Sequence, residues 1–361
     1  MAYTTIDNPS EYFQPVTFTG STSNITVNIG MRPDWFWFKS RTQTYSHLIY
    51  DTSRPSDGTS MPTGDVNMYA SLSTNTNAAE GDNNADGLVQ TSTGFIVDGD
   101  GQAIGEANQG ADNMAAYCWK ANGGTTTSGA GNDSVSTSAH QADTTAGFSI
   151  VTWTGNGSDN ATVKHGLSVK PKMILTKRRD DTGNWQGNNW VSEQDYAQKL
   201  KWNDTDAQTS SDDFVKSADS NVFTLGTDAD VNANNGTYVG YCFAEVQGFQ
   251  HFGQYTGNGN AEGPFIYTGF APAFIIVKRW DGATAWHLYD SGRQDFNDAA
   301  RPTFKVNDND ADFDKAIDFC ASGFKIRDTT SDANSAGAAY VYWAIAKRPF
   351  VSSEGVIGTA I

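Results

Sequence analysis

Two histidines stand shortly before a Tyr-Asp pair, an arrangement that could support acid–base chemistry. His47 is followed by Asp51, and His287 is followed by Asp290. A histidine near a carboxylate can act as a general base. The two pairs occur at corresponding places in an internal repeat, however, so the alternative is a strand histidine whose ring bonds a neighbour. We favour this structural role. Because the sequence also lacks Gly-x-Ser-x-Gly, HExxH, P-loop and Rossmann motifs, we predict no catalytic residues and no enzymatic activity.

Carboxylates are abundant enough to raise two further possibilities, a glycosidase and a calcium site. A glycosidase needs two carboxylates about 5–9 Å apart, and 41 acidic residues give the sequence no means of selecting a pair. The segment Asp308–Asp314 has acidic side chains at alternate positions, but it lacks the Gly and Glu that complete an EF-hand loop. We interpret it as a solvated acidic loop and predict no metal and no cofactor. A polysaccharide depolymerase stays as a less favoured alternative.

The candidates for ligand binding are aromatic residues interleaved with amides. Trp185, Trp190 and Trp202 lie close in sequence to Asn188 and Asn189. Sugar sites combine aromatic rings with a few hydrogen-bonding side chains, so these five residues are predicted ligand-binding candidates. The alternative is that the tryptophans fill the core or a contact between modules, because Trp is highly buried on average. The sequence leaves both interpretations open.

These residues lie within a pattern that occurs three times, from Phe13 to Arg41, from Phe148 to Arg179 and from Phe249 to Arg279. Each copy has an aromatic strand, Thr-Gly with small polar residues, a second strand, a Pro, an apolar run, and Lys with Arg close after it. The copies start 135 (148 − 13) and 101 (249 − 148) residues apart. Solenoid repeats are about 20–50 residues long, so each copy is predicted to be a small domain. About seven short strand candidates per copy are typical of a small antiparallel sandwich.

The predicted fold is therefore all-β, with three repeated antiparallel β-sandwich modules of jelly-roll-like form. The predicted parts are an N-terminal arm at 1–12, module 1 at 13–120, a Gly/Ser/Thr-rich linker at 121–146, module 2 at 147–246, module 3 at 247–346 and a C-terminal tail at 347–361. The linker is expected to be flexible over part of its length. Segments 71–86 and 98–110 are expected as surface loops, and Ser192–Lys201 is the best helix candidate.

Composition argues against several partners. The net charge of −17 argues against direct binding to nucleic acid, because phosphate binding relies on clustered Lys and Arg. No run approaches 18 apolar residues, so no membrane insertion is predicted. Cys118 and Cys242 occupy corresponding places in two copies and Cys320 stands alone, so no disulfide is expected, as in a chain folded in a reducing cytoplasm. The opening residues lack the basic and apolar regions of a secretory signal.

Several long motifs resemble a family of virion proteins of marine tailed phages, including phages of cyanobacteria. They are MAYTTIDNPSEYFQ at the start, TAGFSIVTWTGNGS at 145–158, GYCFAEVQGF at 240–249 and YTGNGNAEGPFIYTGFAPAFIIVKR at 255–279. The likeness runs along essentially the whole chain, as far as the KRPFVSSEGV segment. The chain departs from the family at KRPF (347–350), where Glu before the apolar pair is more usual.

The resemblance implies a structural or tail-fibre-like virion protein with modules distantly similar to concanavalin-type lectins. It brings no catalytic residues. The expected role is attachment to the host surface, with host glycan as the ligand class. The resemblance also implies assembly in the host cytoplasm, localisation in the virion tail or fibre, contacts with other virion proteins, and a homo-oligomer that is a trimer or another cyclic form. The alternative is a purely architectural capsid fibre, decoration protein or tail adaptor, in which the 1–12 arm and the GVIGTAI tail would dock.

Overall fold

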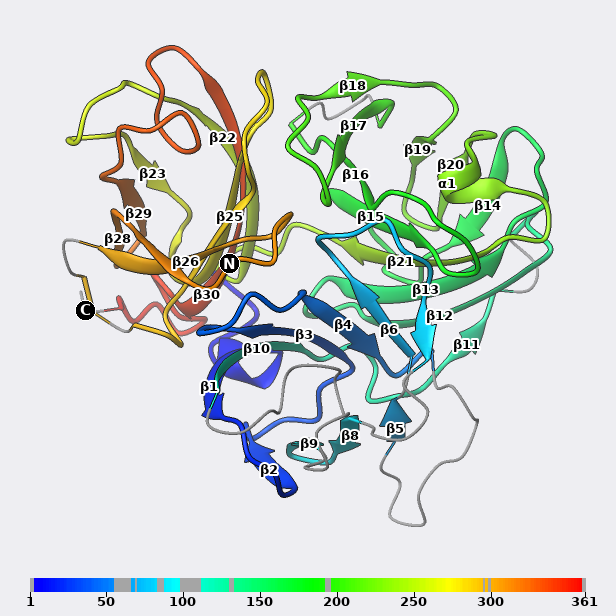
Figure 1. The fold of residues 1–361 in the computed structure, drawn as a ribbon, viewed down its shortest axis with the longest axis horizontal. Coiled ribbons are helices and arrows are strands. Elements are labelled where there is room, and N and C mark those ends of the chain that lie inside the picture. Colours follow the sequence, from blue (N-terminus) through cyan, green and yellow to red (C-terminus); the bar gives the residue numbers. More distant parts are fainter. Residues whose placement is uncertain are drawn as a thin grey trace.

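The computed structural model describes residues 3–54, 66–68, 70–82, 88–97, 112–129, 133–191, 196–294, 296–297 and 300–358. Its regular elements are almost all strands of antiparallel sheets (Figure 1). Within these ranges the helical elements are the 3-10 helix η1 (Pro9–Glu11) and one turn of α-helix, α1 (Ala229–Asn232). The all-β class predicted from the sequence is confirmed. The Gly-rich segment 98–110, expected as a surface loop, lies outside the described residues.

The strands form three pairs of sheets, and each pair uses a separate stretch of the chain. The first pair contains β1 (Phe13–Thr19), β2 (Ile25–Asn28), β3 (Trp35–Ser40), β4 (Leu48–Asp51), β5 (Val66–Met68), β6 (Ala70–Ser73), β7 (Gly81–Asp82), β8 (Leu88–Thr91), β9 (Gly94–Val97) and β10 (Asn113–Trp119). Its large sheet has the order β1-β10-β3-β4-β6-β7, and its small sheet has the order β2-β9-β8-β5.

The second pair contains β11 (Thr127–Ser128), β12 (Thr137–Asp143), β13 (Phe148–Thr154), β14 (Ala161–Lys164), β15 (Met173–Arg178), β16 (Gln186–Asn188), β17 (Gln198–Lys201), β18 (Thr209–Ser210), β19 (Val215–Ala218), β20 (Val222–Leu225) and β21 (Thr237–Phe243). Its large sheet has the order β11-β12-β13-β21-β15-β16-β17-β18, and its small sheet has the order β14-β20-β19.

The third pair contains β22 (Gln250–Thr256), β23 (Phe265–Tyr267), β24 (Phe270–Arg279), β25 (His287–Asp290), β26 (Arg301–Lys305), β27 (Phe313–Lys315), β28 (Ile317–Cys320), β29 (Gly323–Ile326) and β30 (Ala339–Pro349). Its large sheet has the order β22-β30-β24-β25-β26-β27, and its small sheet has the order β23-β29-β28.

The three sheet pairs share one strand order. Their large sheets contain the corresponding series β1-β10-β3-β4, β13-β21-β15-β16 and β22-β30-β24-β25, and in the second sheet β11 and β12 precede this series. Strand register matches as well, because Lys39, Lys177 and Lys278 lie at the same step of β3, β15 and β24. Residues of different pairs can therefore be compared position by position.

Part of the segment 121–146 is not a linker but belongs to the second large sheet. β12 pairs with β13 along its whole length, and β11 extends the sheet by one more strand. A short edge strand at 134–138 is the most that the sequence suggests here, because Thr, Ser, Ala and Gln dominate β12. A strand near the end of a sheet needs little apolar surface of its own when neighbouring strands supply its hydrogen bonds.

Three further expectations are corrected. The helix candidate Ser192–Lys201 ends in a strand, β17, since pairing with β16 overrides its weak helical tendency. The segment 71–86 begins inside β6, where Ser71 is buried, so that part is not a surface loop. β30 runs to Pro349, three residues past the predicted end of module 3 at 346.

A buried asparagine holds the loop that follows the Thr-Gly signature of the repeat. In the third pair, the Asn334 side chain accepts a hydrogen bond from the backbone N–H of Asn258 and donates to the carbonyl groups of Asn260 (2.8 Å) and Asp328 (2.9 Å). Asn232 holds the corresponding loop of the second pair in the same way. One fully buried amide thus satisfies backbone groups of two loops that contain no ladder bonds of their own.

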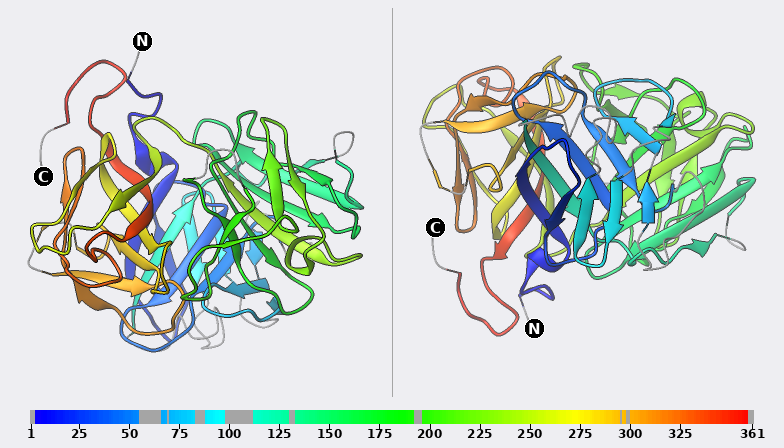
Figure 2. Two further views of the ribbon diagram at one scale, coloured as in Figure 1. Left: turned by 90° about the horizontal axis from the view of Figure 1, so that it is seen from above. Right: turned by 60° about the horizontal axis from the view of Figure 1, so that its bottom comes forward.

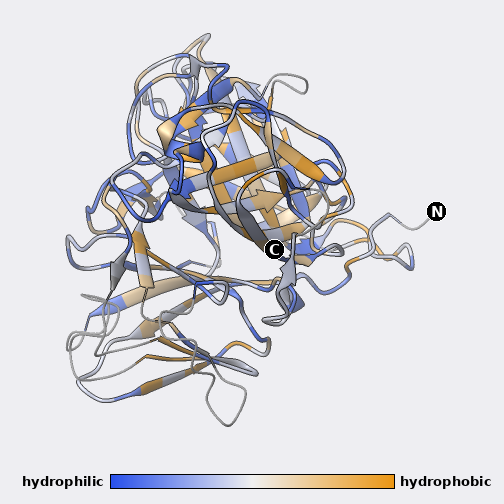
Figure 3. Cartoon of the chain, turned by 90° about the vertical axis from the view of Figure 1, so that its right-hand side faces the viewer, coloured by the Kyte–Doolittle hydropathy of each residue, from blue (hydrophilic) through white to orange (hydrophobic). Residues whose placement is uncertain are grey.

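The three sheet pairs surround a common centre (Figure 1). Smaller apolar clusters fill the first and second sandwiches, whereas the largest cluster combines the third sandwich with residues from all three large sheets. Apolar residues follow the strands and hydrophilic residues dominate the loops around them (Figure 3). The N-terminal segment lies against the third pair near β30, where Ile6 is buried in the shared cluster (Figure 2).

Replacing Asn334 by Ala should lower the free energy of unfolding by about 3 kcal/mol, because it leaves several buried backbone groups without partners. Urea denaturation followed by tryptophan fluorescence measures this loss. Asn221→Ala is the matched control, since among the described residues its exposed side chain bonds only the Ser220 hydroxyl, and the cost should stay below about 0.5 kcal/mol. Equal losses in the two variants would contradict the role of Asn334.

Candidate functional site

The centre of the molecule is a contact among aromatic side chains from all three large sheets. Trp35 lies 4.7 Å from Tyr241 between ring centroids, and Trp119 lies 5.8 Å from Trp343. Phe243 closes the ring of contacts by approaching Trp343 to 4.5 Å. All five side chains are almost completely buried. Large aromatic areas removed from water at one point make the three sheet pairs a single rigid body.

A cyclic set of hydrogen bonds surrounds this aromatic centre. In each pair, the residue just before β4, β16 or β25 forms a side-chain hydrogen bond with a backbone carbonyl of another pair. That carbonyl belongs to the last residue of β26, β6 or β17, respectively. The three bonds are Trp185 Nε1–H to Ser73 O (2.7 Å), Trp286 Nε1–H to Lys201 O (2.9 Å) and His47 Nε2 to Lys305 O (3.0 Å). The register of the strands places the three donors, and the three carbonyl groups, at corresponding positions. The contact therefore runs head to tail around a closed ring.

A second cyclic contact joins a tyrosine of one pair to an Asp-Arg pair of the next. The Tyr241 hydroxyl donates to Asp51 (2.7 Å), which also binds Arg54 (2.6 Å). Burial raises the pKa of Tyr241 well above its ordinary value, so the hydroxyl stays a donor. Burying the Asp-Arg pair is tolerable because both charges are hydrogen-bonded.

The same arrangement recurs at the next contact, where the Tyr117 hydroxyl donates to Asp290 (2.8 Å), the partner of Arg293 (2.5 Å). At the third contact Asn189 stands where the others have Asp, and Trp343 stands where they have Tyr. Trp190 Nε1 there donates to the carbonyl of Tyr342 (3.1 Å). One of three equivalent contacts has thus exchanged an ion pair for tryptophan packing.

The lysine of the repeat signature also belongs to these contacts. Lys177 Nζ donates to the carbonyl of Asn77 (3.4 Å) and Lys278 Nζ to that of Thr205 (3.0 Å), in each case in a neighbouring pair. Burial lowers the pKa of Lys39, Lys177 and Lys278 to about 8 each. The repeated lysine is therefore a buried structural group and not a surface charge.

The five residues predicted to bind a ligand are all in this interior, and the expectation of a sugar site there is corrected. Trp185 and Trp202 are 0% exposed, and Trp190, Asn188 and Asn189 are at most 3% exposed. Asn188 bonds backbone groups within its own sheet pair, and Asn189 bonds Gln208. The Trp202 ring lies 4.9 Å from that of Trp286. The large sheets cover these side chains because each sheet packs on both faces, a burial that local sequence does not reveal.

The two histidines that seemed to correspond lie at different positions of the repeat. Strand register aligns Asp51 with Asp290, which places His47 at the position of Trp286 and His287 one position further along. His47 accepts a hydrogen bond from Trp37 Nε1–H (2.8 Å), whereas His287 faces Asp332 (3.5 Å). Both aspartates bind arginines instead, so the His-Asp pairs considered for acid–base chemistry are not formed.

His47 should make stability sensitive to mild acid. Its Nδ1 accepts from Trp37 while Nε2 faces a carbonyl, so the ring must be neutral, and burial lowers its pKa well below the ordinary 6.5. The unfolded chain binds a proton near pH 6.5 and the folded chain does not, so stability is lost as the pH falls below that value. Between pH 7 and pH 5 the wild type should lose about 1–2 kcal/mol more than His47→Gln, which keeps a donor and an acceptor. Urea titrations at the two pH values measure this difference, and equal losses would contradict it.

Carboxylates of the acidic run 308–314 form ion pairs with nearby lysine and arginine side chains. Asp308 and Asp310 lie 3.7 and 2.7 Å from Lys305 Nζ, and Asp312 lies 2.8 Å from Arg41 Nε. Across the ranges that the structure describes, no group of three His, Cys, Asp or Glu side chains could hold a metal ion. Because Asp312 and Arg41 belong to the third and first pairs, the run contributes to the contact between them.

Among the described residues, β23 exposes two large apolar side chains, Phe265 and Tyr267, and together with Tyr3 they form the β23 surface. Phe265 and Tyr267 of β23 are 50% and 55% exposed, and Val356 and Ile357 are 65% and 64% exposed. The Tyr3 hydroxyl lies 3.0 Å from that of Tyr267. Sequence reasoning missed this surface. The signal that could have found it is the difference between Phe265 and Tyr267 and the polar Thr, Asn and Lys residues at the same places in the other two copies of the repeat.

Two chain segments meet at the end of β23. The carbonyl of Gly269 accepts hydrogen bonds from the Tyr3 hydroxyl (3.1 Å) and from the Phe350 backbone N–H (3.1 Å). Asp7 binds the backbone N–H (2.7 Å) and the hydroxyl of Ser353. The described part of the N-terminal arm and residues 350–353, which precede the GVIGTAI tail, therefore lie together on the third sheet pair.

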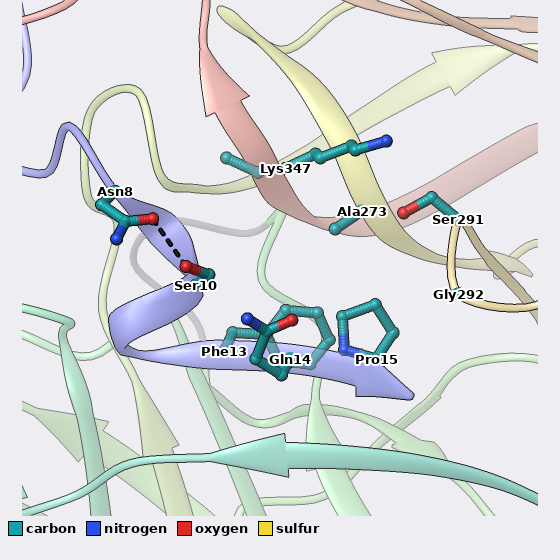
Figure 4. A pocket seen from close by; sticks show the side chains of 10 residues that line it. Asn8, Ser10, Phe13, Gln14, Pro15, Ala273, Ser291, Gly292 and Lys347 are labelled. Carbon is teal, nitrogen blue, oxygen red and sulfur yellow. Dashed lines mark hydrogen bonds between the residues drawn. The ribbon is translucent and has the colours of Figure 1, made fainter. Parts of the chain in front are cut away.

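Two pockets border the N-terminal segment. One of ≈ 500 Å³ lies between β1 and the third pair, with Phe13 and Lys347 in its lining and the hydrogen-bonded Asn8 and Ser10 (2.6 Å) at one side (Figure 4). The other, of ≈ 460 Å³, includes Glu245 in its lining. Neither described lining combines a nucleophile with a histidine base, so neither supports a hydrolytic site.

Comparison with known proteins shows a family match. A family model described as a domain of unknown function, DUF7483, covers residues 8–349. The chain belongs to this family. The match begins just before η1 and ends at the last residue of β30, so it includes all three sheet pairs. No curated protein matches the sequence, and no helix in the described residues is long and apolar enough to cross a membrane.

Removing one tyrosine hydroxyl tests the cyclic contacts. Tyr241→Phe and Tyr117→Phe should each lower the free energy of unfolding by about 1.5–3 kcal/mol, because each hydroxyl bonds a buried carboxylate. Tyr45→Phe is the control, since the half-buried Tyr45 hydroxyl makes no hydrogen bond to a described residue. Chemical denaturation would refute the contacts if all three variants matched the wild type.

Proposed function

We propose that this chain is a non-enzymatic structural component of a tailed-phage virion that acts as a rigid building block and docks onto other proteins. The observation that carries the proposal is the closed ring of contacts around one aromatic centre. Three sheet pairs that share this core cannot turn against one another without exposing it to water. Such a body holds its docking surfaces in fixed positions, as a particle component requires. The resemblance of its long motifs to phage virion proteins supports the virion setting.

The architectural role is favoured over host attachment by the place of the aromatic residues. The tryptophans that suited a sugar site are in the interior, and the indole N–H groups of Trp185 and Trp190 bond carbonyls of neighbouring pairs. The exposed rings instead lie on an edge strand beside Tyr3 and residues 350–358. A strand edge with flanking apolar side chains suits binding to another polypeptide.

Host attachment is the second candidate, because Phe265 and Tyr267 present two half-exposed rings on one strand. Exposed aromatic rings with nearby hydroxyl groups are features of carbohydrate sites. A glycan ligand would therefore be sought at the β23 surface and not at Trp185, Trp190 and Trp202.

The virion setting is tested by purifying particles on a density gradient and measuring the protein by quantitative mass spectrometry. The expected result is recovery with intact particles at a constant ratio to the major capsid protein. Recovery only in the soluble lysate, with none in the particle band, would overturn the proposal.

Binding to host cells separates the two roles. The labelled chain should bind susceptible and resistant cells equally poorly if its role is architectural. Selective binding to susceptible cells that is lost in Phe265→Ala, Tyr267→Ala but kept in Val169→Ala would instead establish attachment. Val169 is a suitable control because its side chain is 49% exposed and lies in the second pair.

A further inference from the structure

The small sheets of the three pairs differ at one outer edge. β2, β14 and β23 are edge strands at corresponding positions of their small sheets. Strand register aligns Val27, Val163 and Ile266, which face the interior of each sandwich. The residues on either side point outward. They are Thr26 and Asn28 in β2, Thr162 and Lys164 in β14, and Phe265 and Tyr267 in β23.

The backbone of β23 presents unused hydrogen-bonding groups at this edge. Thr268 N–H donates to the carbonyl of Ser322 (2.9 Å), so Thr268 and Ser322 form a hydrogen-bonded pair. Such pairs alternate along an antiparallel ladder, so Ile266 also turns its backbone groups to β29, whereas Phe265 and Tyr267 turn theirs away. These outward N–H and C=O groups bond no residue within the described ranges.

The corresponding edge of the second pair is closed by an extended segment. Ser134 N–H donates to the carbonyl of Thr162 (3.1 Å), and Ser134 Oγ accepts from Thr162 N–H (2.8 Å). Asp133 accepts from the N–H of Lys164 (2.6 Å). The segment runs antiparallel to β14 and uses the backbone groups that β23 leaves open. The protein itself thus shows what covers this kind of edge.

The first pair protects its edge in another way, with the exposed polar residues Thr26 and Asn28. Polar or charged side chains on an edge strand discourage pairing with further strands. β23 has no covering segment among the described residues, and it carries the aromatic side chains of Phe265 and Tyr267 at these two positions. Its free edge and its apolar side chains occur together, as expected of a strand that pairs with another chain.

We propose that the occupant of this edge is β23 of a second copy of the chain, paired antiparallel about a twofold axis. An isologous contact needs a patch that is complementary to itself. The β23 edge meets this need, because an axis at Ile266 would place Phe265 opposite Tyr267 of the partner subunit and match every outward N–H with a C=O. The two small sheets would then join into one continuous sheet of six strands, three from each copy. Cross-strand aromatic pairs stabilise such a contact.

The net charge of the chain predicts how the dimer should respond to salt. Each copy has a net charge of −17, so two copies repel one another at long range. Salt screens this repulsion, and the apolar and backbone contacts at the edge do not depend on it. Dimer formation should therefore strengthen with rising ionic strength. This inference deepens the proposed docking role and rests on it for its biological use, but self-association of the purified chain can fail or hold independently of recovery in virions.

Sedimentation velocity of the full chain over about a hundredfold range of concentration tests the proposal. The wild type should show a reversible monomer–dimer equilibrium. A double variant, Phe265→Thr with Tyr267→Lys, carries the two residue types that β14 has at the corresponding positions. It should weaken the dimer at least about tenfold. Val169→Thr, at an exposed apolar side chain of the second pair, should leave it unchanged.

A wild type that stays monomeric throughout, as expected if a different protein covers the edge, would overturn the proposal, and so would a dimer unaffected by the double variant. Thermal melting checks that the variants fold. Hydrogen exchange of the wild type provides a test that needs no variant. The amides of Phe265 and Tyr267 should exchange more slowly as the protein concentration rises, and exchange independent of concentration would also refute the pairing.

Discussion

The structure depends on burying both faces of each large sheet. One face covers the small sheet of its own pair, and the other meets the two remaining large sheets at the aromatic centre. All six residues of β3 are buried, and β24 is buried from Phe270 to Lys278. Strands in such a position cannot alternate between apolar and polar residues, which explains their near-continuous apolar runs. The free energy of this burial holds the three sheet pairs together.

Such a centre also creates a cost, because polar backbone groups near it lose contact with water. The cyclic hydrogen bonds offset that cost by giving carbonyl groups of one pair a donor from the next. Because the chain is repeated, one donor position and one acceptor position of the repeat supply all three of these hydrogen bonds. The contact at Asn189 and Trp343 shows that one of the three can change its chemistry while the ring stays closed.

Residues that are the same in all three sheet pairs serve the fold. Functional residues are therefore sought at corresponding positions where the three pairs differ. One departure, around Trp190, lies inside and serves the contact between pairs. Another lies outside, at β23, where aromatic residues replace polar ones on an open strand edge. The N-terminal segment and residues 350–358 gather at the end of that strand. The sequence difference in the interior therefore concerns how the three sheet pairs pack together, and the difference at the surface concerns binding to another chain.

The sequence by itself determined the all-β class, because the alternation of side chains along a strand, the aromatic content and the turn residues all act over a few neighbours. It could not show that Trp185 and Trp202 are buried between sheet pairs, that His47 corresponds to Trp286, or that 137–143 is a strand paired on both sides. Each of these depends on which strand lies beside which, and on which face a second sheet covers. Only the tertiary structure decided them, because burial and strand register are set by partners far away in the chain.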